Sequence, residues 1–489
     1  MRRLLSLLLL GVALAPGGPA SAAGATPATA ALDLVGHESL GGRGMNAALA
    51  VADHCAYVGS RDDAPPMVVD IADPAHPAVA GQLAAHAGST PRELRAVPSE
   101  RLLVVMFYAL QSGAANRLEV YRWTSDCRTP MPVGAYDFGA QQPHEFYLWQ
   151  DPARPARVLV FQAFFSGGFR GLEVIDLAQP EKPRLAGTWN AVATLGGAAN
   201  LHSIALSADA REAYLALWNG GLLLADTSDF AAGLASPALR LLTPPGNALH
   251  TPPGNVHSAV PLPGRRMLLL TDEIYPPPYG AGCPYGHGTI ADIRDVAHPV
   301  AVSTLTVPEN DQRTCGAAPF STWTSHNPTL TANLALVTWY SAGLQVFDIG
   351  DPAHPTRLAE YRAALGGPRA RDPQLGASPT MSWSYPVIHA GLIYVADINQ
   401  GLLVLRYRGP HQEEIARVAA AEGNSNVAAA VTPSPAPSPL AATPSSHPSP
   451  TPVVPARPAS PGWWPPAAAL AIAAVAGAAV VLRRRSRVT

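Results

Sequence analysis

The chain contains many short segments in which apolar residues alternate with polar ones, the pattern of half-buried β-strands. The clearest segment is GLQVFDIGDPAHPTRLAEYR, which begins at Gly343. A glycine opens it, an aspartate ends a first short strand, and a proline-containing turn leads into a second strand. The same pattern recurs clearly from Pro66, Gly171 and Gly288, and more loosely from Arg117, Gly221 and Gly401.

Each of these segments is preceded by a second predicted hairpin, such as NLHSIALSADAREAYLALWNG from Asn200. Four short strands therefore recur roughly every 50–65 residues, and this repeat predicts seven units between Ala31 and Arg408. No sustained helical period occurs in that region. Repeated four-stranded units of this length are typical of a β-propeller. The sequence predicts an all-β, seven-bladed β-propeller over residues 32–408, with an open two-sheet sandwich as the alternative.

The two ends of the repeat region predict how the ring closes. The last unit stops after its third strand, GLLVLRY, and lacks a fourth. The first unit is preceded by an additional strand, LDLVGHESL from Leu32, which resembles the fourth strands of other units. We therefore expect the N-terminal strand to complete the last blade.

Strands such as LEVIDL and LQVFDI give the repeats a resemblance to LVIVD-repeat proteins. The resemblance extends over the repeat region and is good for four units and looser for three. It implies a β-propeller and a secreted or surface location. It implies little about activity.

The string DPAHP occurs at Asp73–Pro77 and at Asp351–Pro355, between the third and fourth predicted strands of a unit. Aspartate at the start of a turn accepts backbone N–H groups, and proline presets φ. The histidine position holds Lys182 in another unit, so it accepts a different side chain. We therefore expect a structural, solvent-facing role for His76, His298 and His354.

Four other histidines share one position of the repeat, at the start of the innermost strand of blades three to six: His144, His202, His257 and His326. Equivalent inner-strand residues converge on one mouth of the central channel, because the blades are arranged radially. This mouth lies opposite the DPAHP turns. We expect the same mouth to be lined by Arg92, Glu93 and Tyr385 from other inner strands, and by Trp218, Asp272 and Trp339 from the ends of second strands. Glu273 and Tyr340, which directly follow Asp272 and Trp339, are expected there as well.

This histidine set predicts a candidate transition-metal site. Neutral imidazoles with carboxylates nearby are good ligands for zinc, copper or iron, and ligands from separate blades would form a rigid site. Two alternatives remain open: a polar channel lining or organic-ligand mouth, and buried histidines that only make hydrogen bonds. The placement of the histidines also gives a weaker resemblance to propellers of the selenium-binding protein and methanethiol oxidase type.

Other catalytic motifs are absent from the sequence. His144 and Glu145 form an HE pair without the second histidine of HExxH, and there is no GxSxG, GxGxxG or P-loop. Two functional hypotheses follow. The first is a cell-surface binding or adhesion module that uses the histidine-rich mouth for an extracellular ligand or protein. The alternative is a metal-dependent extracellular oxidoreductase or hydrolase, with Glu273 or Glu145 as proton carrier.

Composition narrows the choice of partners and predicts the disulfides. Charged residues make up 14% of the chain and the net charge is −2, so no basic surplus is available for nucleic acid. Four cysteines in an exported chain predict two disulfides, with three possible connectivities. We expect Cys283 to pair with Cys315 and Cys55 with Cys127, because each pair lies on neighbouring loops. Unpaired thiols are the alternative.

The two ends of the chain predict export and membrane attachment. Residues 1–23 combine two arginines, a short apolar run and a small-residue ASA exit, as in a secretory signal peptide. Residues 409–462 contain a Pro/Ser/Ala-rich stretch, which we interpret as a linker and a disordered stalk. Residues 463–489 contain two tryptophans, an apolar run and a basic end, which predict a single-pass anchor on the extracellular face of a bacterial membrane. A buried hydrophobic helix is the alternative for the apolar run.

Overall fold

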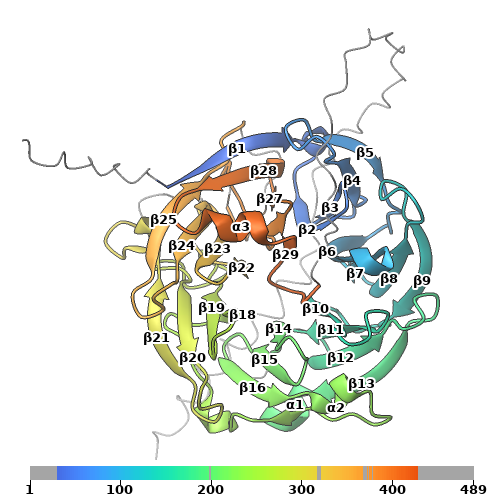
Figure 1. Ribbon diagram of the computed structural model, residues 1–489. Coiled ribbons are helices and arrows are strands. Elements are labelled where there is room, and N and C mark those ends of the chain that lie inside the picture. Colours follow the sequence, from blue (N-terminus) through green and yellow to red (C-terminus); the bar gives the residue numbers. More distant parts are fainter. Residues whose placement is uncertain are drawn as a thin grey trace, which may run out of the picture.

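Six blades are four-stranded antiparallel sheets and the seventh has a fifth strand, and the seven sheets are arranged around a common axis, which we call the channel (Figure 1). The computed structural model describes residues 30–197, 200–315, 321–366, 372, 374–376 and 378–427. The prediction of a seven-bladed β-propeller is confirmed. In blades one to six the chain runs from the innermost strand to the outermost one, as the hairpin order of the sequence predicts.

The strands of the first four blades, from the channel outward, are as follows. Blade one has β2 (Asn46–Ala52), β3 (Cys55–Ser60), β4 (Met67–Asp70) and β5 (Ala78–Gln82); blade two has β6 (Ser89–Val97), β7 (Leu102–Ala109), β8 (Arg117–Arg122) and β9 (Met131–Asp137); blade three has β10 (Phe146–Gln150), β11 (Val158–Phe164), β12 (Gly171–Asp176) and β13 (Arg184–Asn190); blade four has β14 (Ser203–Leu206), β15 (Glu212–Ala216), β16 (Leu222–Asp226) and β17 (Arg240–Leu241).

The remaining three blades complete the ring. Blade five has β18 (Val256–Pro261), β19 (Met267–Asp272), β20 (Gly288–Asp292) and β21 (Val300–Leu305); blade six has β22 (Pro328–Leu330), β23 (Leu334–Trp339), β24 (Gly343–Asp348) and β25 (Thr356–Tyr361); blade seven has β26 (Val387–His389), β27 (Leu392–Asp397), β28 (Gly401–Arg408) and β1 (Ala31–Glu38). Short helices α1 (Ala191–Leu195) and α2 (Ser228–Ala232) lie after the outer strand of blade three and between the third and fourth strands of blade four.

The ring is closed by β1, which pairs antiparallel with β28 from Ala31 opposite Arg408 to Glu38 opposite Leu402. The N-terminal strand is therefore the fourth strand of the last blade, as predicted. Figure 1 shows the two strands side by side although they lie at opposite ends of the described chain. Middle strands such as β23 are buried throughout, because blades pack on both of their faces, whereas outer strands such as β25 are largely exposed.

The DPAHP turns have the structural role predicted for them. The carboxylate of Asp73 accepts a hydrogen bond from the Ala75 backbone N–H at 3.0 Å and contacts His76 Nδ1 at 2.8 Å. The turns with His298 and His354 repeat both contacts. The side chain of His76 is 84% exposed, which explains why a lysine can replace a histidine here.

These turns also support the neighbouring blade. A β-carbon on Gly36 in β1 would lie 2.1 Å from the carbonyl oxygen of Pro74, in the turn of blade one. A β-carbon on Gly134 in β9 would lie equally close to the carbonyl oxygen of Pro180, in the turn of blade three. Both glycines lie where the pairing register shifts. The outer strand of one blade is thus packed against the turn of the next, and in these two places only glycine leaves enough room.

The folded chain continues past Arg408, where the sequence predicts a linker. Helix α3 (Gln412–Arg417) is followed by β29 (Ala420–Ala421), which pairs with β26 in blade seven. The chain then crosses to blade three, where Leu148 N–H donates to Asn424 O at 3.1 Å and Gln150 N–H donates to the Asn426 side chain at 2.8 Å. Figure 1 shows this crossing between β29 and β10. We call residues 420–427 the strap.

The strap carries Glu422, whose side chain is only 11% exposed and whose carboxylate forms an ion pair with Arg95 Nε at 2.6 Å. Burial raises the pKa of Glu422 to about 7, because it outweighs the opposing attraction of Arg95, and Glu93 adds to the increase. The folded state therefore favours protonated Glu422. Its contribution to stability is complete below about pH 4.5 and is lost as the pH rises through about 7.

We therefore expect wild-type protein to lose more stability than Glu422→Gln between pH 4.5 and pH 8, by at most about 3 kcal/mol. Glutamine keeps the size of the side chain and does not titrate. Urea unfolding of both proteins at the two pH values measures the difference. Equal pH dependence of the two proteins would show that Glu422 does not titrate on folding.

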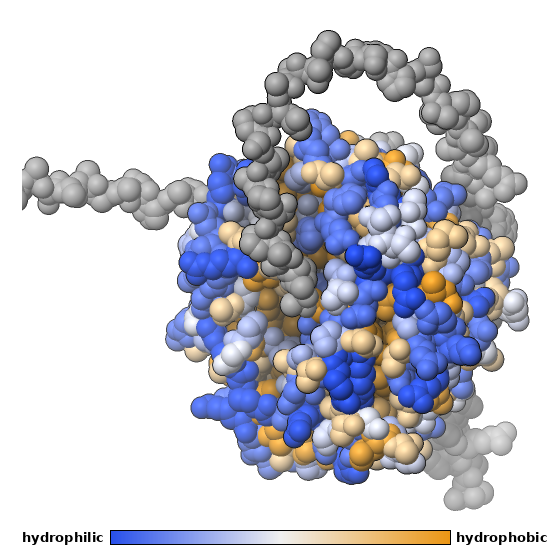
Figure 2. All heavy atoms as spheres, turned by 45° about the vertical axis from the view of Figure 1, so that its right-hand side comes forward, coloured by the Kyte–Doolittle hydropathy of each residue, from blue (hydrophilic) through white to orange (hydrophobic). Residues whose placement is uncertain are grey.

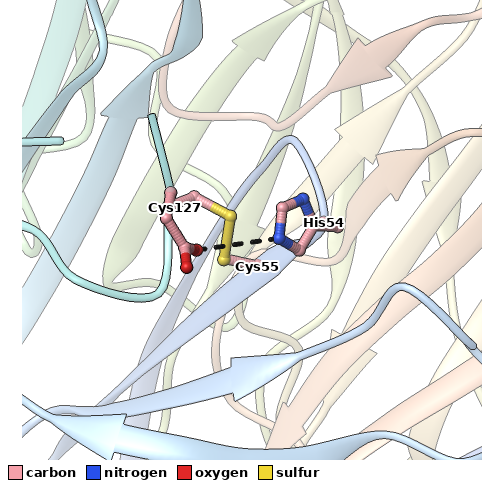
Figure 3. A group of neighbouring side chains, drawn as sticks. His54, Cys55 and Cys127 are labelled. Atoms are coloured by element: carbon pink, nitrogen blue, oxygen red, sulfur yellow. Dashed lines mark ion pairs between the residues drawn. A yellow bond between two sulfur atoms is a disulfide. The ribbon is translucent and has the colours of Figure 1, made fainter. Parts of the chain in front are cut away.

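Both predicted disulfides are present. Cys55, in the first hairpin turn of blade one, is bonded to Cys127, in the third-to-fourth turn of blade two (Figure 3). Cys283, in the loop between β19 and β20, is bonded to Cys315, which follows β21. His54 and Asp126 lie beside the first disulfide, but its sulfurs are oxidised and cannot serve as thiolate ligands.

The predicted signal peptide, stalk and anchor fall on residues 1–29 and 428–489, outside the described residues. Among the helices of the described chain, none has the length and apolarity needed to cross a membrane.

Candidate functional site

The four histidines predicted to converge do so, as a row across the mouth of the channel. The ring centroids are 4.2 Å apart for His144 and His202, 4.1 Å for His202 and His257, and 3.8 Å for His257 and His326. Nε2 of His144 lies 2.8 Å from Nε2 of His202. Each histidine lies at or just before the innermost strand of its blade, so the radial order of blades three to six becomes the order of the row.

The row is buried at one end and open at the other. His202, His257 and His326 are between 1% and 3% exposed. His144 is half-buried, and so are Phe165, whose ring centroid lies 5.2 Å from that of His144, and Trp218, which stacks on His202 at 4.8 Å. A molecule from solvent would therefore meet the row at His144.

Two carboxylates face the row from inside the channel. Oε1 of Glu145 lies 3.4 Å from Nε2 of His257, and Oε1 of Glu273 lies 3.4 Å from Nε2 of His326. The hydroxyl of Tyr340 donates a hydrogen bond to Glu273. The candidate ligand atoms form two overlapping sets, and within each set all atoms lie within 4.8 Å of one another: Glu145, His202 and His257; His257, Glu273 and His326.

A hydrogen-bond network behind the row determines which ring nitrogen His257 and His326 present to the carboxylates. The amide N–H of Asn327 donates to the carbonyl oxygen of Trp383 at 3.2 Å, so the side-chain oxygen of Asn327 faces Ser258 and accepts its hydroxyl at 3.1 Å. The hydroxyl oxygen of Ser258 can then accept from Nδ1 of His257 at 2.7 Å. Nδ1 of His326 donates to Trp383 O at 2.7 Å. In their neutral forms, both rings therefore carry the proton on Nδ1 and present the lone pair of Nε2.

This assignment places acceptors opposite acceptors. The Nε2 lone pairs of His257 and His326 face the carboxylate oxygens of Glu145 and Glu273, and in the described part of the chain no other donor lies between them, so a proton there must be held by the carboxyl group itself. Oε2 of Glu145 and Nδ1 of His202 are also buried without a hydrogen-bond partner among the described residues. Buried acceptors in such an arrangement are costly unless a cation or a proton binds between them.

Burial keeps the imidazoles neutral. It lowers the pKa of His202 to about 3 and lowers the pKa of His257 well below its usual value, where the neighbouring histidines add to the effect. Burial alone would raise the pKa of Glu273, but its contacts with His326, His202 and the hydroxyl of Tyr340 outweigh it and the pKa falls to about 2. Burial and Glu93 raise the pKa of Glu145 well above its usual value. Neutral imidazoles and one ionised carboxylate are the protonation states that metal coordination needs.

Six of the eight residues expected around the mouth lie near the row or behind it, among them Glu273 and Tyr340. The guanidinium carbon of Arg92 lies 5.3 Å from the ring centroid of Trp383, which neighbours His326. Trp218 stacks on His202. Tyr385 is 3.2 Å from Ser258, behind the row, and Glu93 is paired with Arg95 at 3.1 Å.

The other two residues lie elsewhere. Trp339 is buried in the core, packs against Phe347 and donates to Trp323 O at 2.9 Å. The next residue, Tyr340, reaches the site instead. Asp272 accepts a hydrogen bond from Thr251 and belongs to neither candidate ligand set, whereas the next residue, Glu273, does. Successive side chains near the end of a strand point in opposite directions, so an error of one residue exchanges a core residue for a site residue.

Residues that orient the histidines were not identified from sequence. Ser258 and Asn327 directly follow His257 and His326, so the pairs HS and HN were the available signal. Arg61 directly follows β3, as Glu273 follows β19 and Tyr340 follows β23, so its position in the repeat was the available signal. Trp383 comes from the loop before β26, and nothing in the sequence places it here.

The insertion between β19 and β20 lies on this mouth, as predicted. Tyr275 is half-buried, with its ring centroid 6.5 Å from that of Trp218. The hydroxyl of Tyr285 donates to Ser321 O at 3.1 Å and ties the insertion to the segment that leads to His326. Phe165, Trp218 and Tyr275 form an aromatic rim at the open end of the row.

The chain is similar to known proteins in one repeat segment and, at low identity, to several solved structures. Residues 43–84 match the LVIVD repeat. No curated protein sequence matches the chain. Similar solved structures include Sqt1 of Saccharomyces cerevisiae (8% identity, TM-score 0.47, 79% of this chain and 100% of that one) and a chain of the mitotic checkpoint complex (12%, 0.46, 83% and 98%). The periplasmic gluconolactonase PpgL of Pseudomonas aeruginosa is another (14%, 0.44, 72% and 93%). At these values the likenesses say nothing about the activity of this chain.

Proposed function

We propose that this LVIVD-repeat β-propeller binds a transition metal in the mouth of its channel and acts there on a small extracellular molecule. The ligands would come from His202, His257 and His326 together with Glu145 or Glu273. Histidine and carboxylate donors suit zinc, copper and iron, which differ in preferred geometry and share this ligand chemistry.

One observation supports this proposal most strongly. The Nε2 lone pairs of two buried histidines face carboxylate oxygens at 3.4 Å, and hydrogen bonds to Nδ1 hold both rings in that orientation. A metal ion would turn the unfavourable pair of His326 and ionised Glu273 into coordination, and it would replace the proton that the raised pKa of Glu145 keeps opposite His257. Metal-binding histidines commonly donate their other N–H group to a fixed acceptor, as these two rings do.

The burial of the row favours a small ligand over an adhesion partner. His202, His257 and His326 are too buried to touch a macromolecule. On the face shown in Figure 2, hydrophilic residues predominate and hydrophobic ones form scattered patches. Most of the large exposed apolar side chains, such as Val79, Met131 and Leu185, lie singly or in pairs on outer strands of different blades, and the others lie in loops. Surfaces of this kind are ordinary for monomeric proteins.

An enzymatic role for the same site would use the two carboxylates differently. In the metal-dependent oxidoreductase or hydrolase that the sequence suggests as an alternative, Glu145, whose pKa lies well above its usual value, would exchange a proton with the bound molecule, and the hydroxyl of Tyr340 would orient Glu273 as a metal ligand.

For location, we propose an exported protein held at the extracellular face of the membrane by the apolar segment within residues 463–489. The leader-like residues 1–23 and the two disulfides support export, since disulfides persist in oxidising compartments.

Metal analysis of the purified full-length protein tests the proposal. After incubation with Zn²⁺, Cu²⁺ or Fe²⁺ and removal of free ions, we expect at least one tightly bound ion per chain for one of these metals. A metal-free protein after all three incubations would overturn the proposed function.

A further inference from the structure

Three arginines surround the histidine row, and each lies over an aromatic ring. The guanidinium carbons of Arg61 and Arg92 are both 5.3 Å from the ring centroid of Trp383, and that of Arg95 is 5.3 Å from the ring centroid of Tyr385. The ring of Trp383 also lies 5.1 Å from that of His326. The charges of Arg61 and Arg92 therefore lie close to the row, on the side of blades one and two.

The charges of these arginines are balanced unequally. Arg95 is paired with Glu93 and Glu422, and Arg61 is paired with Asp372 at 2.8 Å. Arg92 has no ion-pair partner within the residues that the structure describes. Its charge acts on His144, His202 and His257, where it contributes to lowering their pKa values. A metal ion in the row would add further positive charge.

Arg61 and Arg92 also have hydrogen-bond donors without acceptors. Nε and Nη1 of Arg61 are buried without a partner among the described residues, and so is Nε of Arg92. The side chain of Arg61 is only 5% exposed. A buried N–H group without an acceptor typically costs about 1–3 kcal/mol. A bound ligand with suitable oxygen atoms could provide the acceptors that these N–H groups lack.

We propose that Arg61 and Arg92 bind an oxyanion, the carboxylate or phosphate group of a small organic ligand, beside the histidine row. A guanidinium group donates parallel N–H groups that match the oxygens of both anions. The remainder of the ligand would pack on the aromatic rim of Phe165, Trp218 and Tyr275. The proximity of this anion to a metal rests on the proposed function. Binding of the anion by the two arginines does not.

Calorimetric titration of full-length protein with three aromatic probes tests this inference. Benzoate and phenyl phosphate carry the two anions, and benzamide is the neutral counterpart. We expect at least one of the two anions to bind and benzamide to bind at least tenfold more weakly. The stronger of the two anions identifies the preferred class. Titrations of metal-free and zinc-loaded protein separate the contribution of the arginines from that of the metal.

Arg92→Met should weaken binding of the preferred anion at least tenfold in the metal-free protein, and Arg92→Lys should weaken it less. Lysine keeps the charge and removes the paired donors, so it also tests the role of geometry if the methionine variant folds poorly. Arg294→Met is the matched control, because Arg294 is exposed on the turn face and pairs with Asp292. We expect this variant to bind as the wild type does.

The possible outcomes distinguish this inference from the proposed function. Anion binding that depends on Arg92 in a protein that takes up no metal supports the oxyanion site and overturns the metal site. Metal uptake by a protein that binds benzoate, phenyl phosphate and benzamide with equal affinity supports the metal site and overturns the oxyanion site. Failure of both anions to bind, with and without zinc, would also overturn the oxyanion site.

Discussion

Full-length protein with both His202→Ala and His257→Ala is expected to bind its metal at least about 100-fold more weakly than the wild type. His257 belongs to both candidate ligand sets and His202 to one, so the double change leaves neither set intact. Loss of a residue that merely supports a metal ligand costs about 10- to 100-fold in affinity, and loss of two ligands should cost no less. Competition with a chromogenic chelator measures the affinity.

The control for this experiment is a protein with His76→Ala and His354→Ala. These histidines are exposed on the opposite face and contact only the aspartates of their own turns, so metal affinity should be unchanged. Far-ultraviolet circular dichroism and thermal unfolding of both double variants show whether each is folded. A folded His202→Ala, His257→Ala protein with wild-type affinity would place the metal elsewhere.

The second large effect concerns closure of the ring. Gly36→Ala should destabilise the protein by about 2–3 kcal/mol, in the range of overpacked cores. The new β-carbon would lie 2.1 Å from Pro74 O and 2.9 Å from Pro77 Cδ. The strand cannot move away without disturbing its pairing with β28, which joins the two ends of the ring. Urea unfolding followed by tryptophan fluorescence measures the change.

Gly81→Ala is the matched control. Gly81 lies at the register shift of β5, the outer strand of blade one, but a β-carbon there meets nothing within 4 Å. The two variants make the same change at equivalent places in two outer strands. If they altered the free energy of unfolding equally, contact with the turn of the next blade would not be what requires glycine at position 36.

Much of the fold and part of the site could be predicted because the repeat transfers information from clear copies to weak ones. The third strands from Gly171 and Gly343 fixed the register of the blades, and that register brought His144 and His326 into one row. The pairing of Cys55 with Cys127 followed from the same register, since it places their turns on one face of neighbouring blades.

The parts that were not predicted lie outside the repeat. The strap has no apolar alternation, and its hydrogen bonds join residues far apart in sequence, such as Leu148 and Asn424. Trp383 comes from a long loop before β26. Trp339 and Tyr340 were both expected at the mouth and only Tyr340 reaches it, because the sequence places the end of a strand only to within a residue. At strand ends that uncertainty decides which of two adjacent side chains faces the channel.

The strap also bears on how the ring unfolds. In a ring in which every blade touches only its two neighbours, disorder can begin in one blade and spread stepwise. Here the strap forms backbone hydrogen bonds with β26 in blade seven and with β10 in blade three. Its Glu422 adds an ion pair with Arg95 in blade two. Loss of any of these three blades removes contacts that the other two use. The strap therefore connects three blades across the ring, and we expect it to increase the cooperativity of unfolding.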